Sequence, residues 1–281
     1  MIRRGERGYA LLAAIIGVAA FGFIAFEMMA QNRGVLAEVH AESERAQLAA
    51  AANAGVYAAI AGLATDDVTK RWGIDGRSRL LPFGDIMLTI TVQDERGKIP
   101  LNGIIQEEVR DLFAGVGVTG DQLQSITDAY EDWEDTDSMP RPQGAEADYY
   151  APFGYKPRNA GFHTVGELRM IKGMTDEIYA RIAPAVTTFF GESGGFSEST
   201  SQPLALMVLG EVAANSPEVI EREKELSGQA PVPETLLKAN LTGRTLTIRV
   251  EARRGATYLK RSAIIELTSN KNDPYWFRYL E

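Results

Sequence analysis

The chain has 281 residues, which is enough for one large domain or two small ones. It carries 29 Lys and Arg against 38 Asp and Glu, and the resulting net charge of −9 argues against the basic surface that nucleic-acid binding needs. The absence of cysteine excludes both a disulfide framework and a thiolate metal site.

The acidic excess is concentrated in the middle of the chain. Residues 102–239 contain 23 acidic and 10 basic residues, a net charge of −13. All other residues together contain 15 acidic and 19 basic ones, a net charge of +4, so that the two parts sum to −9. The middle of the chain therefore differs chemically from its flanks.

The N-terminus has the pattern of a single membrane-spanning helix. Arg3, Arg4 and Arg7 precede an apolar run at residues 9–30, which is uncharged as far as Phe26 and has about the 20 residues that span a bilayer. The arginines should stay in the cytoplasm, which places the bulk of the chain on the other side. A cleaved secretory signal is the alternative, but the run is too long for one and no good A-x-A site follows it.

The helical pattern continues beyond the apolar run. No Pro interrupts residues 31–63, and Ala, the best helix former, is dense between Ala46 and Ala61. Apolar residues recur there at helical spacing on one face. The sequence therefore predicts one continuous rod of some 50 residues, which a signal peptide would not form.

Alternating apolar and polar residues predict strands on both sides of the acidic region. Residues 88–92 alternate, Glu95–Gly97 is a predicted turn, and Lys98–Leu101 is a predicted second short strand. Asn102 is a predicted helix N-cap. Residues 245–251 alternate again, followed by a predicted hairpin at Arg254–Gly255 and a returning strand at 257–268.

These elements predict an α+β fold in which a sheet is built on the rod and a helical region is inserted between its strands. The predicted parts are the rod and first strands at 31–101, the helical insertion at 102–239 and the last strands at 240–281. Two consecutive domains are the alternative, which is less favourable because two separate hairpins would have poor independent stability.

A cluster of carboxylates in the insertion is the strongest candidate site: Asp132, Asp135, Asp137, Glu146 and Asp148. Oxygen ligands favour a hard cation, and calcium fits best. The spacing from Asp135 half resembles an EF-hand loop, although Met139 and Pro140 occupy its fifth and sixth positions. A solvated acidic loop without an ion is the alternative, and the residues alone leave both open.

The sequence predicts no enzyme. The paired carboxylates could suggest a glycosidase, but they crowd one turn and no sugar-stacking aromatic pattern accompanies them. His40 and His163, the only histidines, have no matching nucleophile motif. Residues 168–182, with Gly173 at a tight turn, resemble a helix-hairpin-helix unit, which we expect to pack helices because the acidic insertion would repel a polyanion.

Residues 7–12, Arg-Gly-Tyr-Ala-Leu-Leu, resemble the cleavage site of a type IV prepilin. The resemblance implies that residues 1–8 are a leader, that prepilin peptidase cuts after Gly8, and that Tyr9, where Phe is usual, is then N-methylated. The fifth mature position is normally Glu and here is Ala13. A carboxylate in lipid needs a partner, in pilins the amine of the preceding subunit, and a subunit that assembles first has none.

The absence of this Glu is shared with general secretion pathway protein K of type II secretion, and the sequence resembles that family. The match continues through residues 94–102 and further motifs as far as about residue 190: Asp132-Trp133, Asp135, Asp137, Gly144-Ala145-Glu146, Tyr150, Asn159 and Glu167-Leu168. A departure lies in residues 196–210, where Ser199-Thr200-Ser201 replaces the usual Asn-Thr-Ala helix start.

The resemblance implies a pilin-like sheet and the function of a minor pseudopilin. Such a protein forms the tip of the periplasmic pseudopilus with minor pseudopilins I and J, starts its assembly, and is anchored in the bacterial inner membrane by a single pass. The resemblance also implies bound calcium, with Asp135, Asp137 and Glu146 as ligands and Asp132, Asp148 or Asn159 completing or orienting the shell. The alternative function is a membrane-anchored periplasmic module that binds nucleic acid or a ligand through the helix-hairpin-helix.

Overall fold

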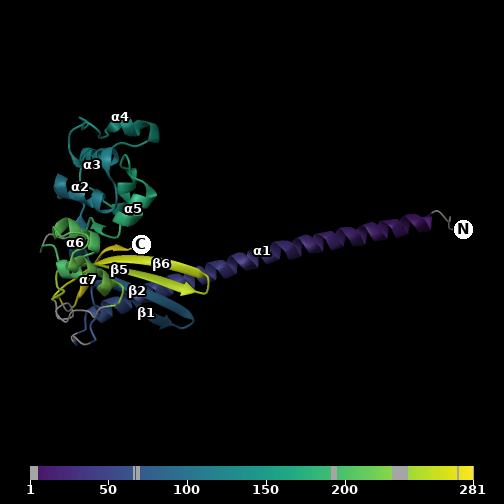
Figure 1. Cartoon of the computed structure of the whole chain (residues 1–281). Helices are drawn as coiled ribbons and strands as arrows, with labels where there is room; N and C mark the ends of the chain where they lie inside the picture. Colours follow the sequence, from purple (N-terminus) through teal and green to yellow (C-terminus); the bar gives the residue numbers. More distant parts are fainter. Residues whose placement is uncertain are drawn as a thin grey trace.

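The computed structural model describes residues 6–65, 67, 70–190, 195–229, 240–270 and 272–280. One long helix, α1 (Glu6–Leu63), runs from the N-terminus into the body of the protein (Figure 1). A five-stranded sheet lies along its C-terminal part, and the other helices gather beside the end of the sheet that is farther from the N-terminus. The predicted α+β class is confirmed.

α1 is the predicted continuous rod, and at 58 residues it is longer than expected. Its C-terminal half packs on the sheet through buried Leu48, Val56 and Ile60. Small alanines between these residues, including fully buried Ala51 and Ala59, let the helix lie close to the strands. The alanines therefore serve both helix propensity and close packing.

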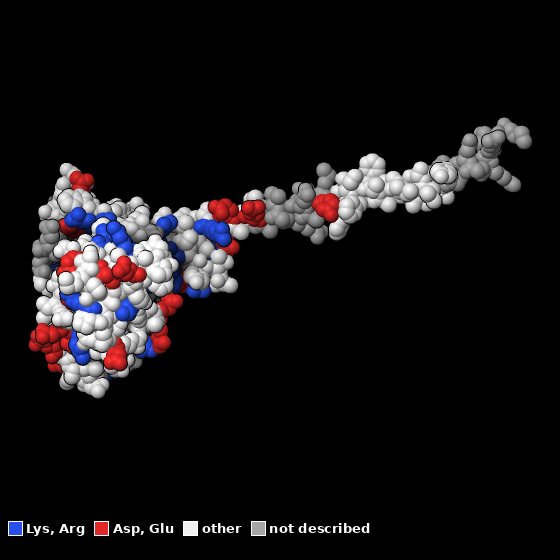
Figure 2. Space-filling view, turned by 90° about the horizontal axis from the view of Figure 1, so that it is seen from above, with Lys and Arg blue, Asp and Glu red and all other residues white. Residues whose placement is uncertain are grey.

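The N-terminal part of α1 exposes its apolar side chains, among them Leu11, Phe21 and Phe26. Figure 2 shows a rod without charged atoms over much of this part. By length and composition one described segment, Glu38–Leu63, could cross a membrane, but 44% of its most apolar window is buried inside the protein. The exposed apolar segment Leu11–Glu27 lies within the predicted span and is therefore the candidate membrane helix.

The main sheet has the strand order β1-β2-β5-β6-β7, and all its pairings are antiparallel. Its strands are β1 (Asp75–Phe83), β2 (Ile86–Asp94), β5 (Thr245–Arg254), β6 (Thr257–Leu267) and β7 (Tyr275–Leu280). The predicted strands at 88–92, 245–251 and 257–268 are confirmed as β2, β5 and β6. The hairpin predicted at Arg254–Gly255 joins β5 to β6.

Neither edge strand, β1 or β7, was predicted from the sequence as a member of the sheet. β1 has no regular alternation and contains Pro82, a residue that strands tolerate mainly at a sheet edge. In β7 Phe277 packs against the rod, where its ring lies 6.3 Å from that of Tyr57 in an edge-to-face contact. Trp276 and Tyr279 of the same strand remain exposed.

The chain between β2 and β5 forms a second, helical part with a hydrophobic core of its own. Its centre is aromatic: the ring of Tyr130 lies 6.2 Å from that of Phe113 and 5.0 Å from that of Phe162. Its helices are α2 (Gln106–Gly115), α3 (Gly120–Glu134), α4 (Ala147–Tyr150), α5 (Asp176–Ile182), α6 (Pro203–Leu209) and α7 (Pro217–Leu226). Short elements complete it: the 3-10 turns η1 (Glu95–Gly97), η2 (Ala151–Phe153), η3 (Val165–Met170) and η4 (Glu198–Thr200), and the strands β3 (Ile99–Pro100) and β4 (Val186–Thr187).

Of two local predictions at the entrance to the helical part, one is confirmed in part and one was wrong. The short strand expected at Lys98–Leu101 is present as the two-residue β3, which pairs in parallel with β4. The N–H groups of Ile99 and Leu101 donate to the carbonyls of Ala185 and Thr187 at 2.8 Å, and Pro100 between them has no N–H with which to bond a further strand. Asn102 does not cap α2, which begins four residues later. Instead its side chain donates to the carbonyl of Phe162 at 3.0 Å and accepts from the N–H of Phe162 at 2.6 Å.

The predicted domain boundaries stay predictions, because residue 239 and residues 1–5 lie outside the described residues. Where Ser199-Thr200-Ser201 replaces the usual helix start, the chain forms η4, and α6 then begins at Pro203 with Gln202 as its N-cap. Thr200 and Ser201 are buried. The departure in sequence thus coincides with a packed turn before the helix.

A buried carboxylate joins the helical part to the sheet. Glu95 is 2% exposed and accepts hydrogen bonds from the Lys98 ammonium and from the hydroxyls of Thr187 in β4 and Thr247 in β5. The neighbouring Asp94, fully buried in β2, accepts from the guanidinium of Arg244 at 2.6 Å. Both acids are compensated, as buried charges must be.

A substitution of Gly97 in η1 tests how tightly the chain is packed at this junction. A Cβ there would lie 2.3 Å from the carbonyl oxygen of Thr200, a backbone atom that cannot turn away. We expect Gly97→Ala to lower the free energy of unfolding by about 1–3 kcal/mol through overpacking. Chemical denaturation of the full chain measures this. Gly195→Ala is the control, since nothing lies within 4 Å of its Cβ position, and equal losses in both variants would contradict the packing argument.

Candidate functional site

Asp132 organises the acidic loop, which we define as residues 132–148, from the last turn of α3 to the first turn of α4. Its carboxylate is fully buried and accepts hydrogen bonds from the backbone N–H of Ala145 at 2.7 Å and of Arg141 at 3.2 Å. The guanidinium of Arg141 donates to it at 2.9 Å. Asp132 therefore closes the loop at its base, and its oxygens are already engaged by donors of the protein itself.

Arg141 is a site residue that the sequence analysis missed. Besides Asp132, its guanidinium pairs with the carboxylate of Asp135 and lies 3.4 Å from that of Glu131. It is the only basic residue of the acidic loop, and this isolation among acids is the signal that could have identified it. It neutralises part of the charge that would otherwise push the loop apart.

Three of the predicted ligands come together beyond this ion pair. One carboxylate oxygen from each of Asp135, Asp137 and Glu146 lies within 4.8 Å of the others. Glu146 is 6% exposed, and within the described part of the chain neither of its carboxylate oxygens has a hydrogen-bond partner. Burial, followed by the nearby carboxylates of Asp132 and Asp135, raises the pKa of Glu146.

An all-oxygen cluster with an unpartnered buried carboxylate fits a hard cation such as calcium, which takes oxygen ligands and would neutralise the charge. The remaining predicted residues lie at its margin. Asp148 is exposed in the first turn of α4 and does not belong to the group of three. Asn159 lies beside the group, where its side-chain amide donates to the carbonyl of Asp137.

The helix-hairpin-helix-like segment is hydrogen-bonded to the acidic loop. η3 and α5 are joined by a turn in which Gly173 has a φ of 84°, a left-handed conformation that favours glycine. Next to it, the backbone N–H of Lys172 donates to the hydroxyl of Tyr150 at 3.1 Å. The ammonium of Lys172 donates to the carbonyls of Gln143 at 2.8 Å and Gly144 at 3.0 Å. The segment therefore has a packing role inside the protein.

The predicted processing residues Gly8 and Tyr9 belong to the first turns of α1, and the side chain of Tyr9 is 83% exposed. The two histidines, His40 and His163, are both exposed. The guanidinium of Arg158 contacts the ring of His163.

Residues 95–190 match the family model described as type II secretion system (T2SS), protein K. The match begins at Glu95, the carboxylate of the junction, and includes the whole acidic loop. We call residues 95–190 the protein K domain after this match. The resemblance noted in the sequence is confirmed over these residues.

Curated relatives carry the same name. A type II secretion system protein K from Dickeya chrysanthemi is 32% identical over 124 residues, which are 42% of this chain and 34% of that protein. Another from Pseudomonas aeruginosa is 32% identical over 113 residues, 36% of this chain and 33% of that protein. The matched part thus spans about a third of the length of these relatives.

The fold also has a counterpart among solved structures. A chain in the crystal structure of the GspK-GspI-GspJ complex from the enterotoxigenic Escherichia coli type 2 secretion system matches with a TM-score of 0.61. The match covers 87% of this chain and 98% of that chain at 14% identity. At this identity the likeness concerns the fold, which extends well beyond the protein K domain to the helix and the sheet.

The acidic loop should make the stability of the protein K domain depend on pH. Burial, followed by the carboxylate of Glu131, raises the pKa of Glu134 to about 7. The folded state then holds this proton better than the unfolded chain. The bound proton of Glu134 contributes fully to the stability of the folded state at pH values below the pKa of Glu134 in the unfolded chain. This contribution is lost as the pH rises through the folded pKa of about 7.

We therefore expect Glu134→Gln to leave the thermal midpoint almost unchanged below the unfolded pKa of 4.5, to raise it increasingly from pH 5 to pH 7, and to change the difference little above pH 8. Thermal melts of the full chain in metal-free buffers measure this difference. The exposed Glu107 of α2 provides the control variant Glu107→Gln. A constant difference between Glu134→Gln and the parent at all pH values would show that burial does not hold the proton.

Proposed function

We propose that the chain is a minor pseudopilin of the type II secretion system, which works as a structural component and not as a catalyst. The observation that carries this proposal is the protein K domain, inserted into a sheet that is mounted on a long helix with an exposed apolar N-terminal part. The chain of the GspK-GspI-GspJ complex has the same fold. Minor pseudopilins I and J are accordingly the proposed partners.

The proposed position is the tip of the pseudopilus. The helical part lies at the end of the molecule opposite the N-terminus of α1 (Figure 1), where it would block a further subunit from stacking above. Ala13 supports the same position, because a first subunit has no preceding amine for a carboxylate to meet. A protein at this position starts assembly and faces away from the membrane.

The proposed topology places the N-terminal arginines in the cytoplasm, the apolar part of α1 in the inner membrane and the sheet and helical part in the periplasm. The charge pattern around the apolar run supports this orientation. Prepilin peptidase would remove residues 1–8 at the cytoplasmic side.

Processing is tested on the full chain in cells that contain a prepilin peptidase. The mature protein should begin at Tyr9 with a methylated amine, and Gly8→Val should leave the precursor uncut. N-terminal sequencing and intact mass measure both. A mature terminus near Gln31 would instead identify an ordinary signal peptide.

Assembly at the tip should depend on the exposed face of α1. Ala46, Ala50 and Asn53 expose small side chains on this face, which permits the close approach of another helix. We expect Ala50→Trp to reduce co-purification with minor pseudopilins I and J from membranes about tenfold or more, as overpacking of a close interface would. Ala114→Trp, at an exposed position of α2, should leave it unchanged. Three full-length chains that stay separate on co-expression would refute the tip model.

We further propose that calcium binds to Asp135, Asp137 and Glu146 and holds the acidic loop together, with Asn159 beside the ion and Asp132 orienting the loop. The unpartnered Glu146 carboxylate supports this proposal, since a cation would neutralise the charge that it brings close to Asp135 and Asp137. Magnesium should substitute poorly, because it prefers a smaller octahedral shell that retains water.

Thermal melts of the full chain in EGTA, calcium or magnesium test the calcium site. Calcium at 100 times its dissociation constant should add about 2.7 kcal/mol of stability. Asp137→Ala should abolish the shift, whereas Glu107→Ala in α2 should keep it. An unchanged midpoint in all three buffers, with no calcium by elemental analysis, would leave the solvated loop as the correct interpretation.

A further inference from the structure

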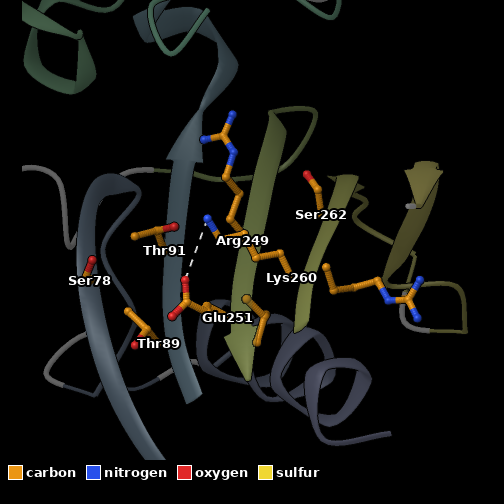
Figure 3. Close-up of a pocket in the computed structure, with 9 residues that line it drawn as sticks. Ser78, Thr89, Thr91, Arg249, Glu251, Lys260 and Ser262 are labelled. Atoms are coloured by element: carbon orange, nitrogen blue, oxygen red, sulfur yellow. Dashed lines mark ion pairs between the residues drawn. The ribbon is translucent and has the colours of Figure 1, made fainter. Parts of the chain in front are cut away.

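The face of the sheet opposite α1 carries a polar groove. Residues of β2 and β5 alternate, so that Leu88, Ile90 and Val250 are buried while the residues between them face outward. A cavity of about 460 Å³ lies on this outer face, and Figure 3 shows its hydroxyl and charged side chains side by side on four strands: Ser78, Thr89, Thr91, Arg249, Glu251, Lys260 and Ser262.

A second and larger cavity, of about 770 Å³, lies where the same face meets the helical part. Its walls include the aromatic rings of Tyr179, Phe189 and Tyr279, and its lining includes the buried pair Glu95 and Lys98. Arg249 and Ser262 line both cavities. The two cavities therefore adjoin and form one groove, which runs from the junction out over the strands.

Two arginines that line this groove, Arg249 and Arg261, have no ion pair within the described part of the chain. Lys98 is paired with Glu95. On the outer face Lys260 lies 3.8 Å from the carboxylate of Glu251, which also pairs with Arg253 at 2.7 Å. Arg249 bonds only to the neutral amide oxygen of Gln93, at 3.3 Å, among the described residues. Figure 3 shows its guanidinium extended along the sheet, away from Glu251 and toward the helical part.

We propose that this groove binds an extended acidic segment of another polypeptide, with a carboxylate of that segment paired to Arg249. Charge complementarity argues for this occupant: the groove presents Arg249 and a shared Lys260 on a chain whose net charge is −9. Each cavity alone has the size of a small-ligand site, and the two in line fit an extended chain of several residues. This binding goes beyond the proposed tip assembly and does not require it.

The groove supplies each kind of contact that such a segment needs. The hydroxyls of Thr89, Thr91 and Ser262 can bond to its backbone or polar side chains. The rings of Tyr179 and Tyr279 can cover its apolar side chains at the junction. Arg249 provides charge-assisted, bidentate bonds to a carboxylate, which fix the position of the segment.

Fluorescence anisotropy of the full chain in detergent micelles tests the proposal. The probe is a panel of labelled heptapeptides that alternate Asp or Glu with Leu or Tyr, and the comparison panel carries Asn or Gln in place of the acids. We expect the acidic panel to bind at least about tenfold more tightly, Arg249→Gln to remove this preference, and Arg249→Lys to restore part of it. A photocrosslinker at Ser262 should attach the acidic peptide.

Arg253→Gln is the matched control. Arg253 lies on the same strand and the same face as Arg249, but it pairs with Glu251 and lines neither cavity. It should retain the acidic preference, and thermal melts should show both variants folded. Equal binding of the two panels, an equal effect of both variants, or competition by inorganic phosphate or anionic vesicles at the same affinity would overturn the proposal.

Discussion

Glu95 links the two parts of the molecule through hydrogen bonds from both of them. Its buried carboxylate receives donors from the connecting turn, from β4 of the helical part and from β5 of the sheet. Removing one partner of a buried ion pair costs about 3–5 kcal/mol, because the other charge stays buried and uncompensated. The position of the helical part relative to the sheet is therefore set by a satisfied charge in addition to apolar contacts.

The elements that could be predicted are those whose pattern is local. The rod follows from alanine density and apolar spacing, β2 and β5 follow from alternating apolar and polar residues, and β6 follows as the strand that returns from the hairpin. The edge strand β1 could not be predicted, because one side of it has no neighbour and its pattern is relaxed. The pairing of β3 with β4 joins residues 87 positions apart, and neither two-residue strand has a signal of its own.

The acidic loop shows the same limit at the level of single residues. The carboxylates of Asp135, Asp137 and Glu146 could be found by counting acids, and they do come together. The different role of Asp132 could not be predicted in this way. It depends on the fold of the loop, which brings the backbone N–H groups of Arg141 and Ala145 to the Asp132 carboxylate. The sequence identifies which residues are acidic. Only the fold determines which carboxylates have donors within the protein and which remain available to a ligand.

This distinction explains how one acidic region can be both stable and open to binding. Arg141 and the backbone satisfy Asp132, so the base of the loop keeps its shape without help. Lys172, bonded to the carbonyls of Gln143 and Gly144, fixes the return of the chain. Glu146, held in place by these contacts but without a donor of its own, is then presented with its charge uncompensated. Preorganisation of this kind lowers the ordering entropy that a bound cation would otherwise have to offset. Any site within the loop therefore depends on the contacts of Arg141, Lys172 and the backbone. These contacts all lie inside the domain that Glu95 links to the sheet.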